Sequence, residues 1–255
     1  MSRSRLRVTV VDDHSLFAES LAIALRTRDI EACTVVPNPS WTTLSQLEHA
    51  IGDTQPHLVL LDLDLGIPGD GMRLLSILSG AGTAVIIVTG SADRVHQGEA
   101  LARGARAVIE KSASFTDIVA TVERAQNRLP VMSRRERDEL VGAYRQATES
   151  HRELCRRFES MTRREAEVLG QLMAGKRVTE IARARVVSES TVRTQVKAVL
   201  AKLEVSSQLT AVGLAHQIGW HPQADDDPAW GHAPSPTRPA GQVPVGSQPS
   251  SWTAR

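Results

Sequence analysis

The chain has few aromatic residues, few cysteines and no long apolar run. Aromatic residues make up 3% of its 255 residues, and the two cysteines, Cys33 and Cys155, lie in different segments. This spacing excludes a disulfide framework or a cysteine metal site, so we expect both thiols to be buried or half-buried. No apolar run approaches the ~20 residues that span a bilayer, and Asp12 and Asp13 interrupt the N-terminal stretch too early for a signal peptide. We therefore predict a cytoplasmic protein with no membrane segment.

Neither sign of charge is in excess over the whole chain, whose net charge is +1. Such a balance argues against a nucleic-acid-binding protein, because phosphate binding usually needs a basic surplus. The charge is unevenly distributed, however. Residues 1–127 carry 11 basic and 15 acidic side chains, whereas residues 161–215 carry 9 and 5. The near-zero total therefore conceals an acidic first part and a basic later part.

Short apolar runs alternate with amphipathic stretches through residues 1–128. The runs are rich in Val, Ile and Leu, as in parallel strands that are covered on both faces. We therefore predict an α/β fold with a doubly wound, five-stranded parallel sheet. The expected strands are 7–11, 32–36, 58–62, 84–89 and 107–110; the expected helices are 16–28, 41–51 after a Ser40 cap, 72–78, 95–103 and 115–129 after a Ser114 cap.

Residues 129–159 form a helical linker in this interpretation, opened by the capping box Ser133-x-x-Glu136. Six residues, most of them apolar, then recur at alternating spacings of four and three, which is typical of a heptad seam. The seam predicts either a helix packed on its own domain or a dimerising coiled coil. Its members are Leu140, Tyr144, Ala147, His151, Leu154 and Phe158.

The remaining chain divides into a small all-α domain, residues 160–218, and a tail, residues 219–255. The tail contains seven of the twelve prolines and almost no aliphatic residues. It cannot bury enough apolar surface to offset the entropy of ordering, so we expect it to be disordered.

Acidic, hydroxyl and ammonium groups stand at the ends of the expected strands. They are Asp12 and Asp13 after the first strand, Asp62 at the end of the third, Thr89 at the end of the fourth and Lys111 after the fifth. The carboxyl ends of parallel strands meet at one edge, so these groups should share one crevice. Clustered carboxylates need a cation, and oxygen ligands suit Mg²⁺ or Mn²⁺. Taken singly, each residue could be a helix cap, a strand end or a solvated lysine; together they predict a phosphoryl-accepting pocket.

Four segments in order, VTVVDDHSLFAESLAIAL, HLVLLDLDLGIPGDGMRLL, AVIIVTG and GARAVIEK, resemble the flavodoxin-like receiver domain of two-component response regulators. The resemblance implies phosphoryl transfer from a histidine kinase to Asp62, with Thr89 and Lys111 reporting it. It also implies Mg²⁺ held by Asp12, Asp13, Asp62 and the backbone carbonyl of Asp64. Two departures are Val108, where the family usually has an aromatic residue, and Ser112, where proline is common.

The Asp62-Leu63-Asp64 motif also resembles that of haloacid dehalogenase-type phosphatases. Those enzymes place further acidic residues after the lysine, whereas here the acidic pair precedes the nucleophile. We therefore keep the phosphatase as a remote alternative and do not expect an enzyme.

Ser188 caps the last long helix expected in the helical domain, which runs through SESTVRTQVKAVLAKL. One face of this helix is apolar and the other carries short polar and basic residues, a pattern that fits a DNA major groove as well as an ordinary solvated face. The stretch from Met161 to Val212 resembles the LuxR-type helix-turn-helix. That resemblance implies base contacts by Arg193, Thr194 and Lys197 and phosphate contacts by Ser188, Ser190 and Thr191. Two departures are Arg185, where the family usually has a buried leucine, and Gln195, where histidine is frequent.

Together the two resemblances imply a DNA-binding response regulator of the NarL/FixJ-like type. Phosphorylation of Asp62 would control dimerisation or domain packing, and an active homodimer would bind two DNA half-sites about one helical turn apart. The alternative suggested by Val108 is a transcription factor whose receiver is regulated by a ligand or partner without phosphorylation.

Overall fold

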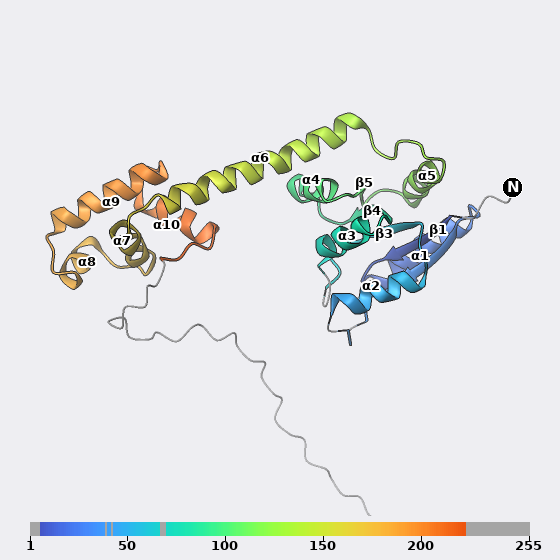
Figure 1. The fold of residues 1–255 in the computed structure, drawn as a ribbon, viewed down its shortest axis with the longest axis horizontal. Coiled ribbons are helices and arrows are strands. Elements are labelled where there is room, and N and C mark those ends of the chain that lie inside the picture. Colours follow the sequence, from blue (N-terminus) through green and yellow to red (C-terminus); the bar gives the residue numbers. More distant parts are fainter. Residues whose placement is uncertain (1–5, 39, 42, 67–69, 223–255) are drawn as a thin grey trace, which may run out of the picture. The chain divides into compact units, whose positions relative to one another are not determined.

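The computed structural model describes residues 6–38, 40–41, 43–66 and 70–222, and Figure 1 shows the course of the chain. It consists of a first unit that ends at Arg157 and a second unit that begins at Phe158. None of the helices in the described ranges combines the length and the apolar composition that a membrane span requires.

The first unit is built on five parallel strands, as predicted (Figure 1). Their order across the sheet is β2-β1-β3-β4-β5, so consecutive strands are joined by helical crossovers. The observed bounds differ from the predicted ones by at most one residue at either end. The strands are β1 (Arg7–Val11), β2 (Glu31–Val35), β3 (Leu58–Leu61), β4 (Ala84–Thr89) and β5 (Ala107–Glu110).

Helices cover both faces of this sheet because successive strand residues point to opposite sides. In β3, Leu60 lies in the cluster formed with α1 and α5, whereas its neighbours Val59 and Leu61 lie in the cluster formed with α2, α3 and α4. Burial of each such leucine contributes roughly 1.5–3 kcal/mol to the stability of the folded unit. The helices are α1 (Ser15–Arg26), α2 (Leu44–Asp53), α3 (Gly71–Gly80), α4 (Arg94–Ala102) and α5 (Phe115–Gln126).

The second helix begins later than predicted, and Ser40 does not cap it. The Asn38 side chain accepts a hydrogen bond from the Ser40 amide at 2.9 Å, which places Ser40 in a turn. The helix starts at Leu44 instead, where the Thr43 amide donates to the Gln46 side chain at 3.2 Å. The polar side chain three residues into the helix therefore fixes its start.

Up to residue 222, where the described part of the chain ends, four helices form the body of the second unit, in agreement with the expected all-α domain. Thr162 caps the first of them, because its side chain accepts from the Glu165 amide and the Glu165 carboxylate accepts from the Thr162 amide at 2.6 Å. Val168, Ile181 and Val192, from three different helices, share one buried cluster. The helices are α7 (Arg163–Met173), α8 (Val178–Ala184), α9 (Glu189–Leu203) and α10 (Gln208–Gln217).

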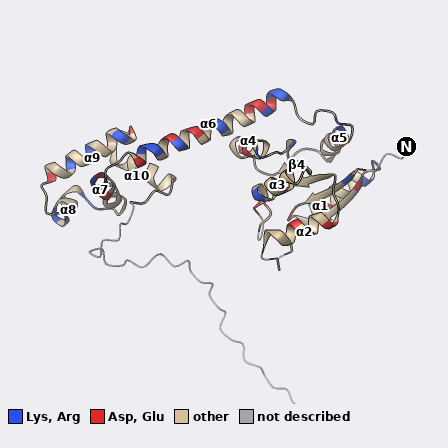
Figure 2. Ribbon diagram, viewed as in Figure 1, with Lys and Arg blue, Asp and Glu red and all other residues tan. Residues whose placement is uncertain are grey.

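One helix, α6 (Arg134–Glu159), passes from the first unit into the second and carries both signs of charge along its length (Figure 2). Within the first unit, Leu140 is 3% exposed and belongs to the core cluster of α2, α3 and α4. The Arg137 guanidinium donates to the carbonyls of Ala105 and Arg106 at 3.0 and 2.6 Å. The start of the heptad seam is thus packed on its own domain; the dimerising coiled coil stays a prediction.

Trp220, which lies within the predicted tail, packs within the second unit. Its ring centroid lies 5.4 Å from that of Phe158, which is buried. The structure describes the chain as far as residue 222, so the disorder expected for most of the tail concerns residues outside the described ranges.

The two cysteines are free, and their exposure differs from the prediction in one case. Cys33 is exposed on β2, whereas Cys155 is half-buried on α6. Cys33 is exposed because β2 is an edge strand and the residue lies between the inward-facing Ala32 and the half-buried Thr34.

Candidate functional sites

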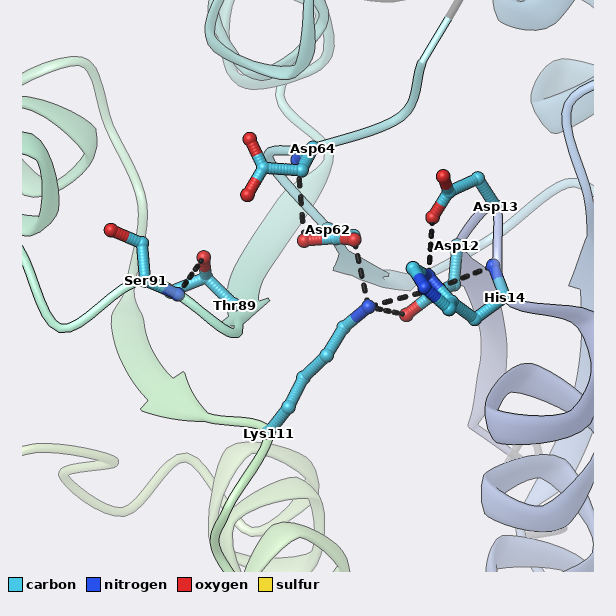
Figure 3. Close-up of polar contacts among 8 residues, drawn as sticks. All are labelled: Asp12, Asp13, His14, Asp62, Asp64, Thr89, Ser91 and Lys111. Atoms are coloured by element: carbon cyan, nitrogen blue, oxygen red, sulfur yellow. Dashed lines mark hydrogen bonds and ion pairs between the residues drawn. The ribbon is translucent and has the colours of Figure 1, made fainter.

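Two carboxylates lie together at the carboxyl end of the sheet. Val11 of β1 pairs with Leu61 of β3, so the residues that follow these strands, Asp12 and Asp62, are brought together (Figure 3). Asp12 and Asp62 are 1% and 2% exposed. Two carboxylates this deeply buried need a positive partner, because burial and mutual repulsion both disfavour their charged forms.

Lys111 supplies that positive charge. Its amide donates to the carbonyl of Thr89 at 2.7 Å, which continues the β4–β5 pairing and directs the side chain into the pocket. Its ammonium nitrogen lies 2.7 Å from Asp12 Oδ2 and 2.8 Å from Asp62 Oδ2 (Figure 3). The ammonium also lies 5.1 Å from the centroid of the Phe17 ring, within the range of a cation–π contact.

The pocket shifts the pKa values of Asp62 and Lys111. Burial raises the pKa of Asp62 above its ordinary value, although the hydrogen bond and positive charge of Lys111 oppose this shift. Burial alone would lower the pKa of Lys111, but hydrogen bonds to Asp12 and Asp62 outweigh it, so the pKa of the ammonium lies above its ordinary value. Lys111 therefore stays charged at neutral pH and holds the two carboxylates together.

Asp13 and His14 complete a cluster with the buried pair. The four residues Asp12, Asp13, His14 and Asp62 each offer one ligand atom, and these four atoms all lie within 4.8 Å of one another. Sequence reasoning missed His14, whose only signal was its place directly after the acidic pair. His14 Nδ1 lies 2.6 Å from Asp13 Oδ1, and its amide donates to Asp12 Oδ1 at 2.8 Å. The three carboxylates offer the oxygen donors that Mg²⁺ prefers, so the donor set fits that ion.

Asp64 and Thr89 lie beside Asp62. The Asp64 amide donates to Asp62 Oδ1 at 3.3 Å, and Asp64 itself is exposed. Figure 3 shows Thr89 on the opposite side of Asp62 from Asp12. The Thr89 hydroxyl accepts from the Ser91 amide at 3.1 Å, which leaves its O–H able to donate elsewhere. The metal role of the Asp64 carbonyl and the reporting role of Thr89 stay predictions.

Val108 occupies the position where the receiver resemblance expects an aromatic ring. It is half-buried and packs against the core cluster of α2, α3 and α4. The side chain is therefore part of the domain interior, and no aromatic ring is available at this position to follow a movement of Thr89.

In the second unit, α9 presents the residues implied as DNA contacts. Ser188 caps this helix by accepting from the Thr191 amide at 3.1 Å. Val192, Val196, Val199 and Leu203 are buried and fix the inward face. All six candidate DNA contacts are exposed, namely Ser188, Ser190, Thr191, Arg193, Thr194 and Lys197.

The basic side chains on this exposed face differ in their contacts. Arg193 lies 3.4 Å from Glu189 one turn earlier, an exposed pair that is weak in water. Lys197 forms no ion pair with any residue in the described part of the chain. A bare ammonium beside short polar side chains suits a negatively charged surface; whether these six residues contact DNA stays a prediction.

The doubly wound domain with its acidic pocket and the helix-turn-helix unit define a two-domain DNA-binding regulator. The chain matches the response regulator receiver domain over residues 8–123 and the luxR family of bacterial regulatory proteins over residues 159–215. It belongs to the response regulators of the NarL/FixJ type, with a receiver domain and a C-terminal LuxR-type DNA-binding domain.

Similar proteins cover nearly the whole of this arrangement. The uncharacterized transcriptional regulatory protein YhcZ of Bacillus subtilis is 31% identical over 211 residues, which is 81% of this chain and 93% of YhcZ. The probable transcriptional regulatory protein NarL of Mycobacterium tuberculosis is 29% identical, covering 83% of this chain and 94% of that protein. Among solved structures, the RcsB response regulator of Salmonella typhimurium has 18% identity and a TM-score of 0.46, covering 84% of this chain and 98% of that one.

Proposed function

We propose that the chain is a transcription regulator switched by phosphorylation of Asp62, with a histidine kinase as donor. The observation that carries this proposal is the shared ammonium of Lys111, which lies within hydrogen-bond distance of both Asp12 and Asp62. An oxygen of the Asp62 carboxylate would attack the phosphorus of a phosphohistidine. The new O–P bond forms as the N–P bond breaks, and the imidazole leaves with the electron pair of that bond.

Asp12, Asp13 and Asp62, together with the Asp64 backbone carbonyl, would hold a Mg²⁺ ion. When bound, this ion supplies positive charge against the phosphoryl oxygens. Lys111 would neutralise a phosphoryl oxygen while keeping its contact with Asp12, and the Thr89 hydroxyl would donate to a second oxygen. The buried floor of the pocket keeps these donors fixed before the phosphoryl group arrives.

The DNA-binding part of the proposal rests on the exposed face of α9. Arg193, Thr194 and Lys197 would contact base edges in the major groove, whereas Ser188, Ser190 and Thr191 would contact phosphates. Phosphorylation would change dimerisation or domain packing, and the active homodimer would occupy two half-sites.

The phosphoacceptor can be tested by treating the full chain with acetyl phosphate and Mg²⁺ and measuring the intact mass. We expect one phosphoryl adduct, lost in Asp62→Asn. Asp64→Asn is the matched control, because it alters an exposed side chain and preserves the backbone carbonyl, so it should still be modified. An adduct that persists in Asp62→Asn would overturn the assignment.

The switch is tested separately with beryllofluoride, using a duplex that the chain itself selects from a random-sequence library. Tighter binding and a larger sedimenting species are expected on modification. Equal affinity at full modification would instead favour a receiver regulated by a ligand or partner, which is the candidate that the missing aromatic ring at Val108 supports.

A further inference from the structure

Arg185 connects the recognition helix α9 to α7, although the LuxR resemblance expects a buried leucine there. Its side chain, directly after α8, is only 18% exposed. One guanidinium nitrogen, Nη2, lies 2.8 Å from Glu167 Oε2 on α7. The other, Nη1, lies 3.3 Å from Gln195 Oε1 on α9 and 3.5 Å from the Arg164 carbonyl. The two departures from the family pattern are therefore in direct contact with each other.

The chemistry of this contact determines how Gln195 is turned. A guanidinium has only N–H donors, so the atom of the Gln195 amide that faces Arg185 must be the oxygen. The amide NH₂ is then directed away from Arg185. Gln195 is half-buried, and its NH₂ group has no hydrogen-bond partner among the residues that the structure describes.

The unused NH₂ group lies next to the proposed DNA-binding face. Gln195 directly follows Thr194, and it lies one helical turn after Thr191, which places it in the same row of side chains. Glu167 keeps the half-buried guanidinium paired, since an unpaired cation at this depth would turn towards water. The NH₂ group of Gln195 is thus an oriented hydrogen-bond donor, and it lies beside residues that are proposed to contact DNA phosphates and bases.

We propose that Gln195 is a further DNA contact, which donates its amide N–H to an acceptor oxygen or nitrogen of the duplex. Arg185 is then a positioning residue that fixes the amide with its donor outward, and Glu167 holds Arg185 in place. This inference rests on the proposed DNA-binding role of α9 and adds to it a residue and its orientation.

A double-mutant cycle on the full chain tests the proposal, with affinity measured by fluorescence anisotropy on the selected duplex and on a random one. Gln195→Met keeps the side-chain length and removes the donor, and Arg185→Leu installs the residue common in the family. Each is expected to weaken binding about 3–10-fold, the loss of one hydrogen bond. Their combination should weaken it no more than either alone, because Arg185 acts through Gln195.

The kind of acceptor follows from the two duplexes. A loss confined to the selected duplex identifies a base edge, whereas an equal loss on both identifies a phosphate; either supports the contact. Arg183→Leu removes the same charge from an exposed position on α8 and should change affinity less than Arg185→Leu.

Three results would overturn the inference: wild-type affinity in Gln195→Met, losses that multiply in the double variant, or an equal loss in Arg183→Leu. Thermal unfolding of each variant separates lost contact from lost fold. If Arg185→Leu does not fold, Gln195→Met alone still decides the DNA contact. A chain that binds no duplex would instead refute the proposed function itself.

Discussion

Val186, in the turn between α8 and α9, combines a φ of 53° with a β-branched side chain. The left-handed region is unfavourable for such a residue, and the side chain is 91% exposed, so packing does not offset the strain. We expect Val186→Asn to stabilise the second unit by about 1 kcal/mol, because asparagine tolerates this conformation. Urea unfolding would measure the gain in a background where the other three tryptophans are replaced by phenylalanine, so that the fluorescence comes from Trp220, which packs on Phe158.

The neighbouring position provides the control. Val187 is also exposed but does not have a positive φ, so Val187→Asn relieves no backbone strain. A similar gain in both variants would show that replacing an exposed valine by a polar residue, and not the backbone of residue 186, accounts for the stabilisation.

Glu165 makes the stability of the second unit depend on pH. Burial alone would raise its pKa, but hydrogen bonds from Lys202 at 2.7 Å and from Thr162 outweigh this, so the pKa in the folded protein lies below the ordinary value of 4.5. The folded state therefore binds this proton more weakly than the unfolded chain does. The resulting stabilisation is present above the unfolded pKa and is lost as the pH falls through the folded one.

Glu165→Gln tests this contribution. It removes the charge and retains an oxygen for the Thr162 amide, so we expect a loss of roughly 1–2 kcal/mol at neutral pH. In urea unfolding, the difference from the natural chain should shrink as the pH is lowered below the folded pKa. A difference that does not depend on pH would contradict the role of the ionised carboxylate.

At the scale of elements, the close contact between α4 and α6 depends on a glycine, Gly98, which has no side chain to separate the two helices. A Cβ added to Gly98 of α4 would collide with the backbone carbonyl oxygen of Leu140. Gly98→Ala should therefore push α6 from α4 and cost about 1–3 kcal/mol in the first unit, measured by urea unfolding. Faster amide hydrogen exchange at the start of α6 is expected with it.

Gly142 lies on α6 two residues beyond Leu140 and is the matched control. A Cβ there meets nothing within 4 Å, so Gly142→Ala should stabilise the helix by about 0.5–1 kcal/mol. Loss of stability in both variants would show that the helix itself, rather than its approach to α4, is sensitive.

The elements were predictable where local chemistry determines them. The alternation of apolar runs predicted β1, β4 and β5 at their observed bounds, and Ser188 and Ser114 cap the helices assigned to them. The start of α2 was not predictable in this way. Ser40 and Thr43 are both acceptable helix caps, and only the turn made by Asn38 distinguishes them. The docking of Leu140 was also open, since a heptad seam does not specify which surface will cover it.

For the whole molecule, the uneven distribution of charge predicts how salt affects DNA binding. The negative first part does not neutralise phosphates, so the slope of log affinity against log salt should reflect the basic residues of the second unit. We expect Lys197→Ala to weaken binding to the selected duplex by roughly 1–3 kcal/mol if it contacts a base. A loss that is equal on random DNA, with the slope reduced by about one, would identify a phosphate contact.

The pocket was predictable at this scale because parallel strands bring their carboxyl ends to one edge. The position of Lys111 between Asp12 and Asp62 follows from that topology. The contact of Arg185 with Gln195 does not, because residues ten apart in different elements meet only once the turn between α8 and α9 is built. Sequence reasoning identified both departures from the family and could not show that they are partners.

The exposed thiol of Cys33 and the half-buried thiol of Cys155 give the natural sequence two places for spectroscopic labels. Both lie in the first unit, one on the edge strand β2 and the other on α6. Nitroxides attached there would record the distance from the sheet to α6 within one molecule, with no cysteine introduced. Comparing that distance distribution before and after treatment with beryllofluoride would show directly whether modification of Asp62 changes the position of α6 on the receiver.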